Sequence, residues 1–242
     1  MRKDAVHRSL DAELAAMRNR GTESPRVLDV GGGSGVWAVP LAAAGCTVTV
    51  LEPNPNALAA LQRRAADEGV TARITPVQDD SDALGTVIPE GQADLVLAHG
   101  LLEAVDDPAA TMSALAAAAS HGGVVSVLVA NRYAAVLHRA MAGHLADARL
   151  LLADPAGRAP DDVEPMRRRL DSDGLCQLFE AASLHVEVLQ GHGVVSDLVP
   201  GSVLESGPDT VAALDELELA SATTPALRNV ASRLHALGRK SH

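Results

Sequence analysis

The residues best suited to do chemistry form a glycine-rich turn, in the segment VLDVGGGSGVWA, which starts at Val27 and joins a predicted strand to a predicted helix. Glycines adopt positive φ and let the backbone approach a ligand closely, while the first amides of a helix offer free N–H groups. Asp29 lies two residues before the first glycine, where a carboxylate would attract a cation and repel a pyrophosphate. The turn therefore predicts a site for a nucleotide cofactor, with Gly31, Gly32, Gly33 and Gly35 as contacts.

Acidic and polar residues also follow the next two predicted strands. Glu52, nineteen residues after Gly33, ends the second strand, where a carboxylate can accept hydrogen bonds from both ribose hydroxyls. Gln78 and Asp79 end the third, where a polar side chain can receive an adenine amino group. Three acidic positions around one pocket suit a ligand that carries a sulfonium and an ammonium. The predicted contacts at this edge are Glu52, Pro53, Gln78 and Asp79.

Two other classes of protein stay open at this point. Residues 33–38 also fit the dinucleotide pattern G-x-G-x-x-A, so an NAD(P)-linked reductase is one alternative. Such a reductase needs a proton-relay residue, and the only tyrosine, Tyr133, has no lysine four residues on. A cofactor-binding domain without catalysis is the other alternative.

The glycine turn and the acidic residues must be positioned by a parallel sheet. Short continuous aliphatic runs alternate with Ala- and Leu-rich runs, as in sheets buried on both faces. The order predicts right-handed crossovers and an α/β, Rossmann-like, doubly wound sheet whose ligands bind at the carboxyl ends of the strands. The expected strands are 26–30, 46–51, 72–77, 93–98 and 123–130, and the expected helices are 5–19, 35–44, 55–68 and 107–120.

Beyond residue 131 the pattern changes to a helical insertion followed by more sheet. Residues 132–152 predict a pair of amphipathic helices, and 153–168 a loop. A helix at 171–182, a strand at 184–190, a helix at 209–220 and a closing strand within 230–240 would bring the sheet to seven strands. We expect a single domain over 1–242: an N-terminal helix in 1–25, a cofactor-binding core in 26–131, a helical lid in 132–170 and the rest of the sheet in 171–242.

Composition excludes several functions. The chain has 242 residues, 47% of them hydrophobic, but three aromatics, so a reader that stacks nucleic-acid bases on exposed rings is nearly excluded. Two cysteines cannot form a disulfide framework or a thiolate zinc site, and the histidines lack ligand spacing, so we predict no metal. With no secretory leader and no apolar run near the ~20 residues of a membrane span, we expect a cytoplasmic protein. The oligomeric state stays open.

Net charge is −11, yet three segments, 1–26, 131–170 and 228–242, are net basic. An acidic body argues against wholesale binding of a nucleic-acid backbone, which depends on neutralising phosphates. The local basic segments are compatible either with a mouth for an anionic substrate or with ordinary solvated helix faces. The densest run, 167–169, is compatible either with a flexible, solvated loop or with a contact to RNA phosphate.

The core segment resembles the class I S-adenosylmethionine-dependent methyltransferases. Their first motif, an acidic residue followed by G-x-G-x-G, matches Asp29 and the turn from Gly31 to Gly35, and the acidic end of their second strand matches Glu52. The match covers residues 26–131. It implies S-adenosyl-L-methionine as cofactor and methyl transfer as activity.

Further residues resemble one branch, the tRNA carboxymethoxyuridine methyltransferases, which esterify a carboxylate on the wobble uridine. The resemblance implies that His99, at the end of the fourth strand, and Arg2, on the first helix, contact the cofactor. Because Arg2 lies so near the start, the sequence is compatible with a chain that begins earlier. The matching positions are His99, Leu102, Glu103, Asp107, Pro108, Asn131, His138 and Gly143.

The second half of the chain departs from the sequence pattern of this branch. Gly193, Val195 and Leu198 stand where the family has an arginine, an aromatic and a tyrosine, and Ser232 precedes Arg233 where the family has an R-Y pair. These substitutions remove groups that stack on bases or bind anions. A tRNA acceptor and a small-molecule acceptor therefore both stay open.

A carboxylate acceptor is chemically sensible. With a pKa near ~4 it is already an ionised nucleophile at neutral pH, so no general base is required. Catalysis then consists of holding the carboxylate in line with the sulfonium methyl group, with arginines as a bidentate clamp. Arg132 and Arg139, seven residues apart on one helix face, and Arg233 are the predicted clamp residues; exposed helix arginines are the alternative interpretation.

Overall fold

A computed structural model describes residues 4–158, 168–205 and 207–241, in two compact units. Arg2 lies outside the described residues. Strands β5, β6 and β7 and helices α1 and α8 are divided between the units. Unit 1 comprises Met1–Ala12, Leu128–Cys176 and Val188–Ala236, and unit 2 comprises Glu13–Val127, Gln177–Glu187 and Leu237–His242.

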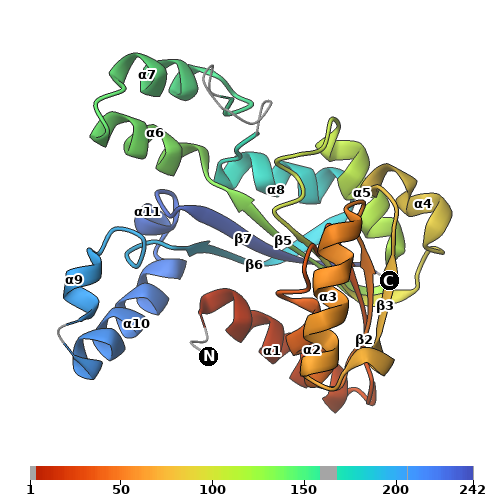
Figure 1. Ribbon diagram of the computed structural model, residues 1–242. Coiled ribbons are helices and arrows are strands. Elements are labelled where there is room, and N and C mark those ends of the chain that lie inside the picture. Colours follow the sequence, from red (N-terminus) through yellow and green to blue (C-terminus); the bar gives the residue numbers. More distant parts are fainter. Residues whose placement is uncertain (1–3, 159–167, 206, 242) are drawn as a thin grey trace. The chain divides into compact units, whose positions relative to one another are not determined.

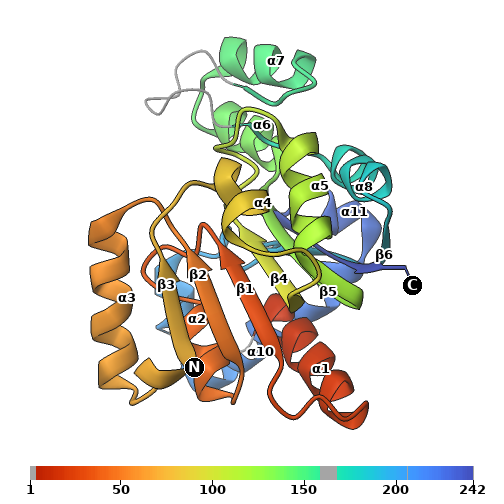
Figure 2. The ribbon, with the colours of Figure 1, turned by 90° about the vertical axis from the view of Figure 1, so that its right-hand side faces the viewer.

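The strands form a seven-stranded sheet in the order β3-β2-β1-β4-β5-β7-β6, which confirms the predicted sheet. β1 pairs in parallel with β2 and β4, and β2 in parallel with β3. Figure 2 shows β3, β2, β1 and β4 side by side. The strands are β1 (Arg26–Val30), β2 (Thr47–Leu51), β3 (Ile74–Val77), β4 (Ala93–His99), β5 (Ala119–Ala130), β6 (Leu184–His192) and β7 (Arg233–Lys240).

The core of unit 2 is aliphatic, as the runs of Val and Leu predict. The strands β1 and β4 are buried over nearly their whole length, and Leu28, Leu95 and Leu97 are almost fully enclosed. Burial on both faces explains why these strands read as continuous apolar runs and not as alternating ones.

The helices of unit 2 begin at residues that the sequence marks. Asn54 caps α3 (Pro55–Asp67) by accepting the Asn56 N–H, and Asp107 caps α5 (Pro108–Ala118) by accepting two backbone N–H groups. In both, proline opens the helix, where its missing N–H costs nothing. The other helices are α2 (Ala38–Ala43), which packs on β2 and β3, α4 (Leu84–Val87), and two 3₁₀ turns, η1 (Thr71–Arg73) and η2 (Ser81–Ala83).

The end of β7 is anchored in unit 2 by Arg239. Its guanidinium donates to Glu13 at 2.8 Å and to Glu187 at 2.6 Å, and also to the carbonyl of Gly122 at 2.9 Å. The hydrogen bond to Glu187 raises the pKa of Arg239, and the hydrogen bond to Glu13 raises it by a smaller amount. The arginine therefore ties together segments that are distant in sequence.

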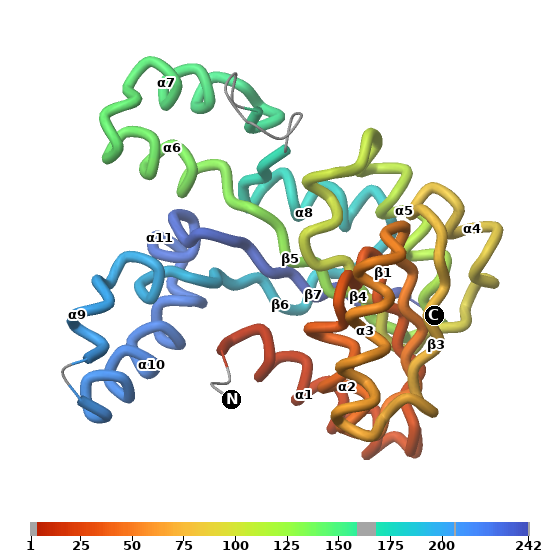
Figure 3. Tube along the Cα trace, viewed as in Figure 1, coloured from red at the N-terminus to blue at the C-terminus, as the bar shows by residue number. Residues whose placement is uncertain are grey.

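Unit 1 contains a helical hairpin, α6 (Arg132–Met141) and α7 (Leu145–Ala153), which pack on each other and are drawn in green in Figure 1. Gly143 takes a φ of +85° in the turn between them. This pair confirms the helices predicted over 132–152. Figure 3 traces the hairpin together with the remaining helices of this unit, α9 (Gly201–Leu204), α10 (Pro208–Thr223) and α11 (Pro225–Arg228).

Side chains in unit 1 satisfy backbone groups that no strand or helix pairs. The carboxylate of Glu218, on α10, accepts the N–H groups of Val194, Val195 and Ser196 at 2.7–2.9 Å, and these three hydrogen bonds lower its pKa against the opposing effect of burial. The buried Asn131 donates to the carbonyls of Asn229 and Ala231. The first set of contacts fixes the loop that follows β6, and the second fixes the loop that precedes β7.

Three local expectations were wrong. The helix predicted over 35–44 begins only at Ala38, because Gly33 and Gly35 take positive φ and keep the preceding residues in a turn. The strand predicted to begin at 123 begins at Ala119, whose backbone is already extended. For the same reason the helix predicted to reach residue 120 ends at Ala118. The short helices α4, α9 and α11 were not predicted. Part of the predicted loop at 153–168 falls outside the described residues.

No described helix is both long and apolar enough to span a bilayer. No three or more His, Cys, Asp or Glu side chains among the described residues are grouped so as to hold a metal ion.

Candidate functional site

The glycine turn follows β1 and is shaped by contacts that exclude side chains. A Cβ on Gly32 would lie 2.6 Å from Oδ2 of Asp29 and 2.8 Å from Val50. Gly35 has a φ of +79°, and a Cβ there would collide with Leu61. No side chain therefore fits at Gly32 or at Gly35 without displacing a neighbour.

Glu52 follows β2 and is held against the glycine turn. Its Oε2 accepts the N–H of Gly33 at 3.0 Å, and its Oε1 accepts the N–H of Asn54 at 2.9 Å. Each carboxylate oxygen has a second lone pair, so the side chain can still accept two hydroxyl protons. The two backbone hydrogen bonds fix its orientation before any ligand arrives.

Asp29 is buried in β1, only 1% exposed, and its Oδ2 has no hydrogen-bond partner among the described residues. Burial, and after it the neighbouring charge of Glu52, raises the pKa of Asp29 to about 7. A buried carboxylate without a partner is costly unless a cation or a proton neutralises it. The site therefore fits a ligand that brings an ammonium group to the glycine turn.

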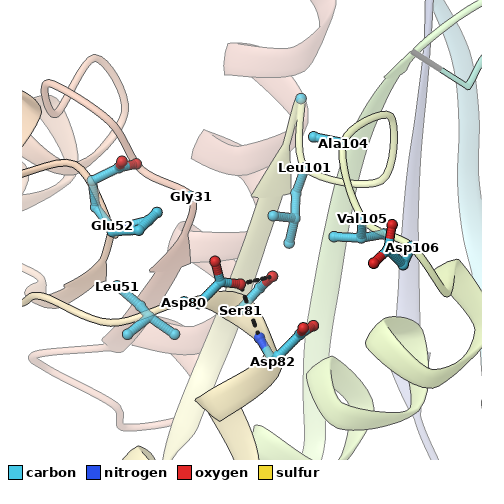
Figure 4. Close-up of a pocket in the computed structure, with 12 residues that line it drawn as sticks. Gly31, Leu51, Glu52, Asp80, Ser81, Asp82, Leu101, Ala104, Val105 and Asp106 are labelled. Atoms are coloured by element: carbon cyan, nitrogen blue, oxygen red, sulfur yellow. Dashed lines mark hydrogen bonds between the residues drawn. The ribbon is translucent and has the colours of Figure 1, made fainter. Parts of the chain in front are cut away.

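A cavity of about 340 Å³ in unit 2 opens beside the turn. Figure 4 shows Glu52 on one side and Leu101 and Asp106 on the other, with the segment Asp80–Asp82 between them. Four carboxylates line the cavity, and none of its described lining residues is Lys or Arg. The four are Glu52, Asp80, Asp82 and Asp106.

The polar residues predicted to end β3 lie just before this lining. Gln78 and Asp79 are exposed and follow Val77, the last residue of β3, and the cavity is lined instead by Asp80 and Asp82. The carboxylate of Asp80 accepts the hydroxyl of Ser81 at 3.1 Å and the N–H of Asp82 at 3.2 Å. The sequence signal for these residues is the acidic run QDDSD at 78–82, of which only Gln78 and Asp79 are predicted contacts.

His99, the last residue of β4, is positioned by two side chains of unit 2. Its Nε2 lies 2.9 Å from Oγ of Ser126, and the ring of Trp37 meets it edge to face with centroids 4.7 Å apart. The next two residues, Gly100 and Leu101, line the cavity. Trp37 thus orients a residue beside the cavity.

A second cavity, of about 500 Å³, lies within unit 1 between the end of β5, the beginning of β7 and the inner face of α6. Two arginines, Arg139 and Arg169, and two histidines, His138 and His144, line it, with no carboxylate among its described lining residues, and we call it the cationic cavity after its arginines. Arg139 is 3.7 Å from Asp147. Arg169 donates to the Gly157 carbonyl at 3.1 Å.

The three predicted clamp arginines differ in their surroundings. Arg139 lines the cationic cavity. Arg132 is largely buried: it pairs with Asp171, donates to the carbonyl of Asp154 and stacks on the Tyr133 ring. Arg233 is exposed at the beginning of β7, directly after Ser232, which lines the cavity. Of the three, only Arg139 lies at the cavity.

The fold and the glycine turn define a nucleotide-cofactor protein, and the comparisons identify its family. A sequence model described as a methyltransferase domain matches residues 2–193, so the chain belongs to that family. It is a member of the S-adenosylmethionine-dependent methyltransferases, whose cofactor fits the acidic turn described above. Membership confirms the resemblance and decides against the NAD(P)-linked reductase.

Individual relatives are distant. The chain is 28% identical over 144 residues to a tRNA 5-carboxymethoxyuridine methyltransferase of Escherichia coli (strain K12), a match covering 60% of this chain and 54% of that protein. It is 30% identical over 184 residues to a ubiquinone biosynthesis O-methyltransferase of Methylocella silvestris, covering 75% and 66%. The chain thus spans about half to two thirds of the length of these curated relatives.

Solved structures show the fold. A crystal structure of an S-adenosylmethionine-dependent methyltransferase from Methanosarcina mazei superposes with a TM-score of 0.61 at 15% identity, covering 93% of this chain and 97% of that one. At this identity the likeness concerns the architecture alone. It confirms the doubly wound sheet predicted from the strand and helix pattern and the class I methyltransferase fold that the resemblance implies.

Proposed function

We propose that the protein transfers the methyl group of S-adenosylmethionine to the carboxylate, or another anionic oxygen, of a small organic acid. The observation that carries the proposal is the charge of the two cavities. The cavity beside the glycine turn is lined by four carboxylates, and the cavity between β5 and α6 by two arginines and two histidines. The first suits a cationic donor, and the second an anionic acceptor.

In this proposal the donor cavity binds through residues already fixed in the protein. Asp29 receives the ammonium of the donor's methionine part, and Glu52 accepts the ribose hydroxyls. The glycine turn leaves room for the ligand beside the backbone, and His99 contacts it at the end of β4. Gly31, Glu52 and Pro53 line the cavity, whereas Gln78 and Asp79 stay predicted contacts.

The acceptor carboxylate must be oriented, and it needs no general base because it is already ionised. When bound, S-adenosylmethionine supplies an electrophilic methyl group on a sulfonium. A bond forms between the acceptor oxygen and the methyl carbon while the sulfur–carbon bond breaks, and the two charges cancel without a proton transfer. Arg139 and Arg169 hold the carboxylate through charge-assisted hydrogen bonds.

A narrower candidate is the same reaction on the carboxymethoxyuridine of a tRNA. The Escherichia coli relative supports it. The composition supports the small acid instead, because the three aromatics leave few rings for base stacking and Phe179 is fully buried. Neither Trp37 nor Tyr133 lines the cationic cavity.

The test uses donor labelled with tritium in the methyl group, incubated separately with deproteinised metabolite extract and with total tRNA. We expect label in the metabolite fraction that mild alkali releases as volatile methanol, because esters hydrolyse and methyl ethers do not. Label confined to tRNA would support the narrower candidate. Alkali-stable label would contradict a carboxylate acceptor, and no label in either fraction would contradict methyl transfer.

A further inference from the structure

The helical hairpin of unit 1 exposes an unusual amount of aliphatic surface. Of the eleven large hydrophobic side chains exposed among the described residues, five fall between residues 137 and 152. Three lie where α6 ends and α7 begins: Leu137 is 45% exposed, Met141 69% and Leu145 68%. We call these three the aliphatic edge. Scattered apolar side chains are ordinary on a surface, but a cluster indicates a binding partner.

The aliphatic edge adjoins the cationic cavity by helix geometry. Leu137 and Met141 follow Ala134 and His138, both of which line the cavity, by three positions, and residues three apart are neighbours on a helix. Leu145 directly follows His144, another lining residue. The cavity and the aliphatic edge are therefore two parts of one surface.

The cavity itself is larger and more apolar than a bare carboxylate requires. Four of its ten lining residues are alanines, and its volume is about 500 Å³. A single water occupies about 30 Å³ of liquid, and a carboxylate little more. Cavities of this size hold an organic molecule of drug-like size, with a few polar groups that fix its orientation.

Together these features specify the acceptor beyond its charge. We propose, resting on the function proposed above, that the acceptor is an amphiphilic acid: its carboxylate lies against Arg139 and Arg169, and its hydrocarbon chain extends from the alanine-lined cavity over the aliphatic edge. Charge complementarity selects the head group, and the exposed Met141 and Leu145 select the chain. A short polar acid fills neither the volume nor the edge.

The test is a chain-length series of straight-chain carboxylates, from butyrate through hexanoate and octanoate to decanoate, titrated below micelle formation and followed by calorimetry. Each methylene buried should tighten binding by about fourfold at most. We expect affinity to rise along the series and then level off once the chain has covered the edge. Equal affinity along the series, or no binding of decanoate, would overturn the proposal.

Substitutions locate the effect. The double variant Met141→Gln, Leu145→Gln should weaken decanoate binding by about tenfold and leave butyrate unchanged. The control is Leu217→Gln on α10, which alters another exposed leucine, 51%, that is not part of the cavity lining. Arg139→Gln should weaken every member of the series alike. A double variant that behaves like the control would place the chain elsewhere and contradict the proposal.

Two parallel measurements keep the outcomes distinct. Titration with S-adenosylhomocysteine reports on the donor cavity. If the wild type does not bind S-adenosylhomocysteine, the result counts against the proposed function and not against the role of the aliphatic edge. Sedimentation reports on self-association. If the wild type dimerises, the double variant is monomeric and chain length has no effect, then a second copy covers the edge and the amphiphile proposal is wrong.

Discussion

The two cavities of this protein differ in the charge of the side chains that line them. In unit 2, Glu52 is fixed by two backbone N–H groups, and Asp29 is buried in a strand. In unit 1, Arg139 is held by an ion pair at 3.7 Å and lies beside exposed aliphatic side chains. A cavity lined by carboxylates suits a cationic donor, whereas a cavity lined by arginines suits an anionic acceptor. The overall charge of −11 conceals this contrast.

The largest expected effect is the loss of stability when a side chain is added to the glycine turn. Gly35→Ala should lower the free energy of unfolding by about 2–4 kcal/mol, because alanine is strained at a φ of +79° and its Cβ collides with Leu61. The matched control is Gly33→Ala, where φ is +56° and nothing lies within 4 Å of the new Cβ, so only strain of about 1 kcal/mol is expected. Urea unfolding measures both. Equal losses would mean that packing does not shape the turn.

The next effect tests the unpartnered carboxylate. The folded-state pKa of Asp29 is raised to about 7, so the folded chain binds a proton that the unfolded chain has lost, and stability falls as pH rises toward 7. Relative to Asp29→Asn, the wild type should lose about 2–3 kcal/mol between about pH 5 and pH 8. Denaturant unfolding of both proteins at each pH checks this. A constant difference would show that Asp29 is ionised throughout.

A smaller effect distinguishes the arginines of unit 1. Arg139→Gln should raise the KM for the acceptor by about tenfold, the cost of one charge-assisted hydrogen bond, and leave the affinity for S-adenosylhomocysteine unchanged. Arg132→Gln should instead reduce stability, because it leaves Asp171 without its partner in a largely buried pair. If Arg132→Gln raised the KM and Arg139→Gln reduced the stability, the roles assigned to the two arginines would be reversed. Steady-state kinetics and thermal unfolding separate them.

The smallest expected effect is that of salt. Raising ionic strength to about 0.5 M should increase the KM for the anionic acceptor by a fewfold, because the arginines and histidines of its cavity are partly exposed to screening. The affinity for S-adenosylhomocysteine, which carries no net charge, should change less. Kinetics and calorimetry over a salt series measure the two constants. Equal salt dependence would contradict the opposite charges of the two cavities.

The sequence predicted the sheet and the donor turn because both depend on local chemistry. Continuous aliphatic runs mark buried strands, and the glycines with Asp29 and Glu52 lie at fixed offsets from strand ends. The element boundaries failed where glycine conformation decided them, as at Ala38. The domain organisation, the cytoplasmic location and the site roles stay predictions.

Residues that depend on tertiary contacts could not be found from spacing. Arg132 and Arg139 share a predicted helix face, but Asp171, distant in sequence, engages one of them and not the other. Arg169 was expected in a loop, and its place at the cationic cavity depends on how residues 168–170 return to β5. No periodicity encodes such contacts.

The most direct test of the donor site is titration with S-adenosylhomocysteine of the wild type, of Glu52→Ala and of the control Glu68→Ala, an exposed carboxylate at the end of α3. We predict that the wild type and the control bind alike, and that Glu52→Ala loses about 10- to 100-fold in affinity, or about 1.5–3 kcal/mol. A wild type that does not bind, or a Glu52→Ala variant that binds as the control does, would contradict the assignment.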